Sequence, residues 1–264
     1  GGETGTDVEK LKVTGLPRHI EEGHQYPMII VSPQEHIVGQ GWDINTLHDF
    51  YHKITEKYPV DKNRVYLTGL SMGGFGTWNF AIAYPELFAA IIPICGGTHM
   101  PDYIRRLKRM PVWCFHGDAD TVVPLAESEK IVEALKRIGG DVKFTVYPGV
   151  GHDSWTETYL NQDIYEWLLR HKRIKNTPVE IDPNLLELYA GNYRSETGLV
   201  IRFVPEGAGL KIWFGDTEGP VLNAASGNEF YYDEYAKDLI TFENDELNER
   251  TGVYFNGMFL RKEG

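Results

Sequence analysis

A serine between glycines, Gly69-Leu70-Ser71-Met72-Gly73, is the part of this 264-residue chain best suited to chemistry. It follows an apolar run at 64–68 and precedes a helical pattern, so the serine is expected on a tight strand-to-helix turn. Glycines beside it leave room for strained backbone. The pattern predicts Ser71 as a nucleophile and the Met72 backbone N–H as an oxyanion donor. A glycine-rich structural turn is the alternative.

A serine hydroxyl needs a base to take its proton and an acid to orient that base. Asp120 follows the apolar run at 111–116, and His152 lies among glycines after the run at 142–147. If these runs are parallel strands, Ser71, Asp120 and His152 all lie at the carboxyl edge of one sheet. We therefore predict Asp120 as the orienting acid and His152 as the base.

Other reactive side chains are assigned to structure. Asp118 is expected in a turn or at a helix cap, and His116, at the end of a strand, in the packed core. Cys95 and Cys114 lie in apolar runs, as buried free thiols do. The sequence predicts no metal site and requires no cofactor.

Aromatic residues near the predicted site could contact a substrate ring. Trp42 and Trp155 are the candidates, with Trp78 as a further one. Such side chains can stack on a sugar or a phenolic ring, although packing is the favoured alternative for each.

The first part of the chain alternates β-branched runs with helical patterns, which predicts a mostly parallel sheet covered by helices. The expected strands are 28–32, 64–68, 90–94, 111–116 and 142–147. The expected helices are 44–58, 75–84, 125–138 and 159–171.

Beyond residue 175 the pattern changes. Residues 176–183 carry two prolines and are predicted as a linker between a domain at 1–175 and one at 184–264. Short apolar runs separated by turn residues then predict a small antiparallel barrel or sandwich. Its expected strands are 189–194, 199–204, 210–214, 221–224, 229–232, 239–243 and 252–260.

Composition excludes some classes of protein. The formal net charge is −12, and residues 176–264 hold 16 acidic and 7 basic side chains, so most of the negative charge belongs to the second domain. This balance argues against a nucleic-acid partner, because phosphate binding needs clustered lysine and arginine. No run of about 20 apolar residues predicts a membrane span.

These motifs resemble those of α/β-hydrolase esterases grouped as phospholipase/carboxylesterase-like, feruloyl-esterase-like or "predicted peptidase" proteins. The matching pieces are VDKNRVYLTGLSMGGFGTW, FAAIIPICGG, PVWCFHGDADTVVP and YPGVGHDSW. The resemblance implies a nucleophile at Ser71, an acid at Asp120 and a base at His152. It also implies a small ester or an ester-decorated polysaccharide as substrate.

The end of the chain more weakly resembles lipocalin-like β-modules attached to some bacterial serine hydrolases, through LELYAGNYRSETG and LITFEND. Structural packing or a part in assembly, including a homo-oligomer, is favoured there over ligand binding. This resemblance slightly favours a periplasmic or secreted location.

One departure from the family concerns the start of the chain. Family members carry a strand ending in a His-Gly-Gly-type sequence, which donates a second oxyanion N–H. This sequence opens at Gly1-Gly2, so we expect a hydrolase domain that lacks its N-terminal strands, with Gly1 or Gly2 as the candidate second donor. Losing one such donor costs about 3 kcal/mol.

Three functions are compatible with the sequence. A serine carboxylesterase, acting on acyl or feruloyl esters of plant polysaccharide, is the first. A serine peptidase with the same residues is the second. A catalytically weak hydrolase-fold protein with a binding or assembly role is the third.

Overall fold

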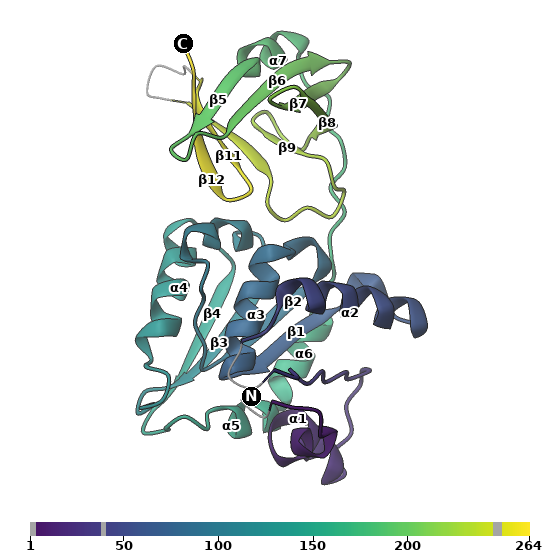
Figure 1. The fold of residues 1–264 in the computed structure, drawn as a ribbon, viewed down its shortest axis with the longest axis vertical. Coiled ribbons are helices and arrows are strands. Elements are labelled where there is room, and N and C mark those ends of the chain that lie inside the picture. Colours follow the sequence, from purple (N-terminus) through teal and green to yellow (C-terminus); the bar gives the residue numbers. More distant parts are fainter. Residues whose placement is uncertain (1–3, 38–40, 245–249) are drawn as a thin grey trace. The chain divides into compact units, whose positions relative to one another are not determined.

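The computed structural model describes residues 4–37, 41–244 and 250–264. The chain divides into two compact units, Gly1–Arg173 and Ile174–Gly264 (Figure 1). Each unit buries apolar side chains of its own. Among the described residues, no helix combines the length and the apolar character that a membrane crossing requires.

Unit 1 is built on a sheet of four parallel strands in the order β1-β2-β3-β4. The strands are β1 (Tyr66–Leu70), β2 (Ala90–Ile94), β3 (Val112–Gly117) and β4 (Val142–Tyr147). Because the strands are parallel, the loops that follow them meet at one edge of the sheet.

Helices cover both faces of this sheet (Figure 1). The α-helices are α1 (Gly15–Glu21), α2 (Ile44–Lys57), α3 (Met72–Ala83), α4 (Ala126–Arg137), α5 (Trp155–Leu160) and α6 (Gln162–Arg170). Short 3₁₀ segments are η1 (Val8–Val13), η2 (Lys62–Arg64), η3 (Pro85–Leu87) and η4 (Pro101–Leu107). Helices α2, α3 and α4 pack on one face, and α1, α5 and α6 on the other.

Because helices cover both faces of the sheet, its central strands are apolar on both sides. Every residue of β2 and β3 is buried. In β2, Ile91 packs under α2, α3 and α4, whereas Ile92 faces α5 and α6. Such continuous apolar runs are typical of a parallel sheet with both faces covered.

One predicted strand is absent. Residues 28–32 form no strand in the structure, and Ile29 and Val31 are 61% and 42% exposed. A strand exists only through its backbone partner, and within the described residues no strand pairs with the outer edge of β1. The sheet therefore has four strands rather than the five expected.

The last predicted helix of unit 1 is also interrupted. Residues 159–171 belong to two helices, α5 and α6, because the chain leaves the helix at Asn161. The Asn161 side chain accepts a hydrogen bond from the Asp163 N–H at 2.9 Å and so begins α6 as its N-cap.

Unit 2 is a closed antiparallel barrel preceded by α7 (Pro183–Tyr189). Its strands are β5 (Gly191–Ser195), β6 (Val200–Glu206), β7 (Gly209–Phe214), β8 (Thr217–Ala224), β9 (Glu229–Tyr231), β10 (Ile240–Asn244), β11 (Arg250–Phe255) and β12 (Met258–Lys262). They close in the order β10-β11-β12-β5-β6-β7-β8-β9. The predicted fold class, a mostly parallel α/β sheet followed by an antiparallel β-domain, is confirmed, and the β-domain is a barrel.

The run at 252–260, expected as one strand, is a hairpin. Its two strands meet at Asn256 and Gly257, whose φ angles are 47° and 79°. Asn-Gly is the sequence that best tolerates two successive positive φ angles in a two-residue turn.

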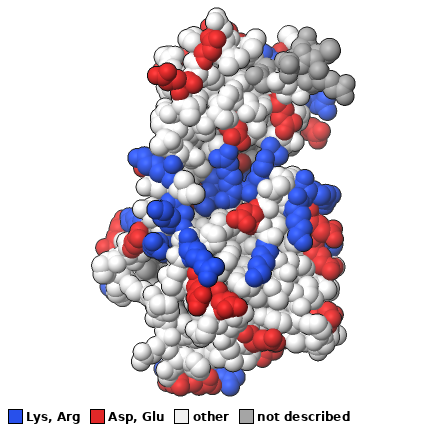
Figure 2. All heavy atoms as spheres, turned by 180° about the vertical axis from the view of Figure 1, so that it is seen from behind, with Lys and Arg blue, Asp and Glu red and all other residues white. Residues whose placement is uncertain are grey.

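The barrel interior is filled with aromatic rings. Five of its side chains are fully buried and contact one another edge to face or tilted. They are Tyr189, Tyr193, Phe203, Phe230 and Phe242. An eight-stranded barrel is just wide enough for its own side chains. On the face shown in Figure 2, acidic side chains are scattered over the barrel rather than gathered in one patch.

Candidate active site

Ser71 lies between the last residue of β1 and the first residue of α3, with φ 54° and ψ −118°. Positive φ is unusual for a residue with a side chain and costs about 1–3 kcal/mol. The glycines beside it make the turn possible. A Cβ on Gly69 would lie 2.2 Å from the Gly73 carbonyl oxygen, and one on Gly74 would lie 2.4 Å from the Ile94 carbonyl oxygen.

A methyl group at Gly74 should therefore separate α3 from β2. We expect Gly74→Ala to lower the free energy of unfolding by about 1–3 kcal/mol, as overpacked cores do. Urea denaturation measures this loss. Gly41→Ala is the matched control, because a Cβ there meets nothing within 4 Å. Equal stability of the two variants would contradict the tight contact at Gly74.

The structure brings Ser71, His152 and Asp120 into one hydrogen-bonded chain. The Ser71 Oγ lies 2.9 Å from His152 Nε2, and His152 Nδ1 lies 2.7 Å from Asp120 Oδ2. The three residues follow β1, β4 and β3, so the shared sheet edge positions all of them. Their catalytic roles remain predictions.

The loop after β3 holds Asp120 firmly. Its Oδ1 accepts hydrogen bonds from the Val122 and Val123 N–H groups, at 2.8 and 2.9 Å. Burial alone would raise the pKa of this carboxyl group, but the hydrogen bonds from His152 and the two backbone groups outweigh it and lower the pKa. Asp120 is therefore a carboxylate at neutral pH.

The carboxylate decides the tautomer of His152. An ionised Asp120 only accepts hydrogen bonds, so His152 Nδ1 carries the proton that it donates to Oδ2. Nε2 is then left with a lone pair that accepts the Ser71 hydroxyl proton. This is the arrangement that a general base requires.

His116 contributes to the same network, a contact that the sequence did not predict. The side chain is fully buried, as expected for a core histidine. Its Nε2 lies 2.9 Å from the Val123 carbonyl oxygen and 3.3 Å from Asp120 Oδ2, and its Nδ1 lies 2.8 Å from the Ser128 Oγ. His116 thus packs behind the carboxylate and the loop that holds it.

The three tryptophans differ in the residues that they contact. The Trp155 ring meets the His152 imidazole edge to face, at 5.2 Å between centroids. Trp42 instead packs against Gly76 of α3, where an added Cβ would lie 2.5 Å from its ring. Trp78 is fully buried in the core of unit 1. Of the three, Trp155 is the one that contacts the predicted base.

Met72 is the first residue of α3, a helix of 12 residues. The first N–H groups of a helix have no intrahelical acceptor, and the helix dipole favours negative charge there. The other oxyanion candidate, Gly2, lies outside the described residues, as does Gly1.

The structure contains two groups of side chains with metal-ligand chemistry, although the sequence predicted no metal site. His48 and His52 lie one turn apart on α2, with their Nε2 atoms 3.2 Å apart, a His-x-x-x-His spacing that the sequence does contain. The Cys95 thiol lies near Asp120 and His152, and the three ligand atoms are within 4.8 Å of one another. Burial raises the pKa of this thiol to about 12, so Cys95 is protonated at neutral pH.

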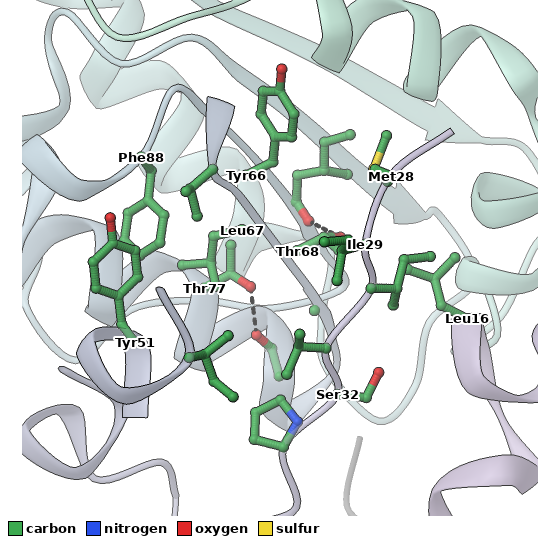
Figure 3. Close-up of a pocket in the computed structure, with 18 of the residues that line it drawn as sticks. Leu16, Met28, Ile29, Ser32, Tyr51, Tyr66, Leu67, Thr68, Thr77 and Phe88 are labelled. Atoms are coloured by element: carbon green, nitrogen blue, oxygen red, sulfur yellow. Dashed lines mark hydrogen bonds between the residues drawn. The ribbon is translucent and has the colours of Figure 1, made fainter. Parts of the chain in front are cut away.

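An apolar cavity of about 430 Å³ runs beside β1. Figure 3 shows Met28 and Ile29 on one side of it and Leu67 of β1 on another. The hydroxyl groups of Thr68 and Thr77 donate to the carbonyl oxygens of Ile92 and Gly73, which leaves the walls largely apolar. The cavity reaches Gly69 and Leu70, but Ser71 and His152 are not in its walls.

Part of this chain is similar in sequence to known proteins. Residues 42–171 match the family model described as phospholipase/carboxylesterase. Acyl-protein thioesterase 1 of Neurospora crassa is 30% identical over 125 residues, which are 43% of this chain and 51% of that protein. A probable acetylxylan esterase A of Aspergillus fumigatus is 25% identical over 186 residues, 61% of this chain and 46% of that protein.

One solved structure is also similar to part of this chain. A thermostable esterase is 43% identical, with a TM-score of 0.48 over 49% of this chain and 36% of that one. The chain spans about half the length of the curated relatives it matches. Unit 1 has the α/β-hydrolase fold, and the curated relatives that match it are named as esterases and thioesterases.

Proposed function

We propose that the chain is a serine hydrolase that cleaves carboxylic esters through an acyl-enzyme. The observation that carries this proposal is the chain of hydrogen bonds from the Ser71 Oγ through His152 to Asp120. The strained backbone of Ser71 supports it, because strain of this kind clusters at functional sites. The family match over residues 42–171 supports the same reaction class.

In the proposed reaction, His152 Nε2 takes the hydroxyl proton as the Ser71 Oγ attacks the ester carbonyl carbon. The Met72 N–H donates to the oxyanion of the tetrahedral intermediate. His152 then returns the proton to the departing alcohol, which leaves an acyl group on Ser71. Water attacks this acyl-enzyme with His152 again as base, the bond between the acyl carbon and the Ser71 Oγ breaks, and His152 returns the proton to the Oγ as the carboxylic acid leaves. Asp120 stabilises the imidazolium in both steps.

For the substrate we propose an ester with a short acyl or a feruloyl group, carried by a small alcohol or by polysaccharide. The name of one relative, acetylxylan esterase, supports a sugar-linked ester, and that of another, acyl-protein thioesterase, supports an acyl group on sulfur. The edge-on contact of Trp155 with His152 offers an aromatic surface next to the reacting serine.

The barrel has a structural role in this proposal. Its interior is occupied by buried aromatic side chains, which supports a packing or assembly function over binding a small molecule inside it.

A fluorophosphonate probe tests the reaction class. We expect the probe to bond covalently to the Ser71 Oγ and mass spectrometry of the digested protein to find the adduct on that residue. Heat-unfolded protein is the control, because the hydroxyl is activated only while His152 lies beside it. A native chain that takes up no probe, or takes it up elsewhere, would refute the proposal.

A substrate panel tests the bond that is cleaved. Nitrophenyl acetate, methyl ferulate, acetylated xylan, an acyl thioester and a peptide anilide are compared at equal concentration. We expect the esters to be hydrolysed fastest. Faster cleavage of the anilide would instead make the protein a peptidase.

A further inference from the structure

Cys95 lies at the carboxyl end of β2, between the end of β1 that carries Ser71 and the β3 loop that carries Asp120. Its φ is 40°, and its N–H donates to the Phe115 carbonyl oxygen at 2.9 Å. The thiol is fully buried and unpaired with the other cysteine. The proposed hydrolytic reaction assigns it no role.

The surroundings of the thiol contain two further metal-ligand types. One ligand atom from each of Cys95, Asp120 and His152 lies within 4.8 Å of the others. Ligands of a single tetrahedral zinc ion lie about 3.2–3.7 Å from one another, since Zn–N, Zn–O and Zn–S bonds measure about 2.0–2.3 Å. Side-chain movements of about 1 Å would bring these atoms to one ion.

A second observation points to the same place. The fully buried Ser154 hydroxyl lies beside the Cys95 thiol, within hydrogen-bonding reach of its sulfur. A hydroxyl at this position can donate to a thiolate, which is the form of cysteine that binds metal.

We propose that Cys95, Asp120 and His152 form a binding site for a thiophilic divalent metal ion, of which Zn²⁺ and Cd²⁺ are the test cases. The thiolate and the carboxylate together match the charge of such an ion. Binding releases the thiol proton to solvent. The proton on His152 Nδ1 passes to Nε2, and the lone pair thus freed on Nδ1 binds the metal.

An ion at this site would inhibit hydrolysis. With its proton on Nε2, His152 cannot accept the hydroxyl proton of Ser71, and Asp120 no longer orients the imidazole. This consequence rests on the proposed function, whereas binding itself does not. The two are therefore measured separately.

Binding is measured on the full chain by titration with Cd²⁺, following the ultraviolet charge-transfer absorption of the cadmium–thiolate bond. We expect the band to saturate at one ion per chain, to disappear in Cys95→Ser and to persist in Cys114→Ala. Cys114 is the matched control, because it is also a buried free thiol but has no place in the cluster. A band that survives Cys95→Ser, or that wild type lacks, overturns the site.

The exposed pair His48 and His52 can also hold a transition metal, so Zn²⁺ titrations are done in a His52→Ala background. There we expect Cys95→Ser to raise the Zn²⁺ concentration for half-inhibition at least 10-fold, each rate being compared with that of the same variant without metal. Equal sensitivity with and without the thiol would overturn inhibition through this site.

If Cys95→Ser fails to fold, as judged by circular dichroism, His152→Ala takes its place. That variant keeps the thiol but loses one ligand, and we expect it to weaken Cd²⁺ binding at least 10-fold. Unchanged affinity contradicts the shared site. A chain that binds Cd²⁺ as expected but hydrolyses no ester leaves the site intact and refutes the proposed function alone.

Discussion

Replacing Ser71 by alanine should abolish ester hydrolysis, with a loss of about 10⁶-fold in kcat, the size seen when the nucleophile of such a constellation is removed. The reason is chemical: without the Oγ there is no atom from which His152 can take a proton and no site for the acyl group. Steady-state kinetics on nitrophenyl acetate measures the loss.

The same substitution should leave the fold intact. Alanine removes a hydroxyl that is hydrogen-bonded to His152, and the backbone strain at position 71 remains. Thermal unfolding of Ser71→Ala should therefore follow that of wild type closely. Hydrolysis that persists in a folded Ser71→Ala protein would mean that another group carries the reaction.

Asp120→Asn should lower kcat by about 10⁴-fold, as the corresponding change does in serine proteases. An asparagine oxygen can still accept from the Val122 and Val123 N–H groups, which turns the amide NH₂ toward His152. The imidazole then keeps its Nδ1 lone pair and carries its proton on Nε2, facing Ser71. A kcat within about tenfold of wild type, with normal folding, would argue against Asp120 as the orienting acid.

The effect of Asp120→Asn on the free energy of unfolding should also depend on pH. The pKa of Asp120 is lowered in the folded chain, so its carboxylate contributes stability above the ordinary carboxyl pKa of about 3.9, and the contribution is lost as the pH falls through the folded value. The stability difference between wild type and Asp120→Asn should shrink between neutral and acidic pH. Urea unfolding at a series of pH values measures it.

Local sequence predicted most elements of the fold because their determinants are local. The glycines of the Ser71 turn, the apolar runs of β2 and β3 and the helical periodicity of α4 each reflect a constraint that neighbouring residues can show. Residues 28–32 have the same apolar character, but within the part of the chain that the structure describes no strand pairs with them. Whether such a partner lies beside a run is a property of the whole sheet, not of the run.

The hairpin of β11 and β12 is a different case, because its signal was present. Asn256-Gly257 marks a two-residue turn, yet the apolar residues on either side hid it within one long run. The break at Asn161 is similar: asparagine is a favoured N-cap, but it lay within a helical pattern.

Within the candidate site, sequence order was enough to name Ser71, Asp120 and His152, since each follows a strand. It could not place His116 behind Asp120 or Cys95 beside His152. Those contacts depend on the lateral order of β1, β2 and β3 and on the direction of the side chains. No periodicity or motif in the sequence indicates either of these. Trp42, another candidate for substrate contact, packs against Gly76 of α3, and that contact too depends on the tertiary fold.

The backbone at Ser71 and Cys95 has a consequence for protein design. Two neighbouring strands, β1 and β2, are each followed directly by a non-glycine residue at positive φ. A procedure that optimises stability alone would place glycine at both positions, because glycine adopts this conformation without steric cost. It would thereby delete the hydroxyl and the thiol together. Backbone stability alone therefore does not explain why serine and cysteine stand at these two positions.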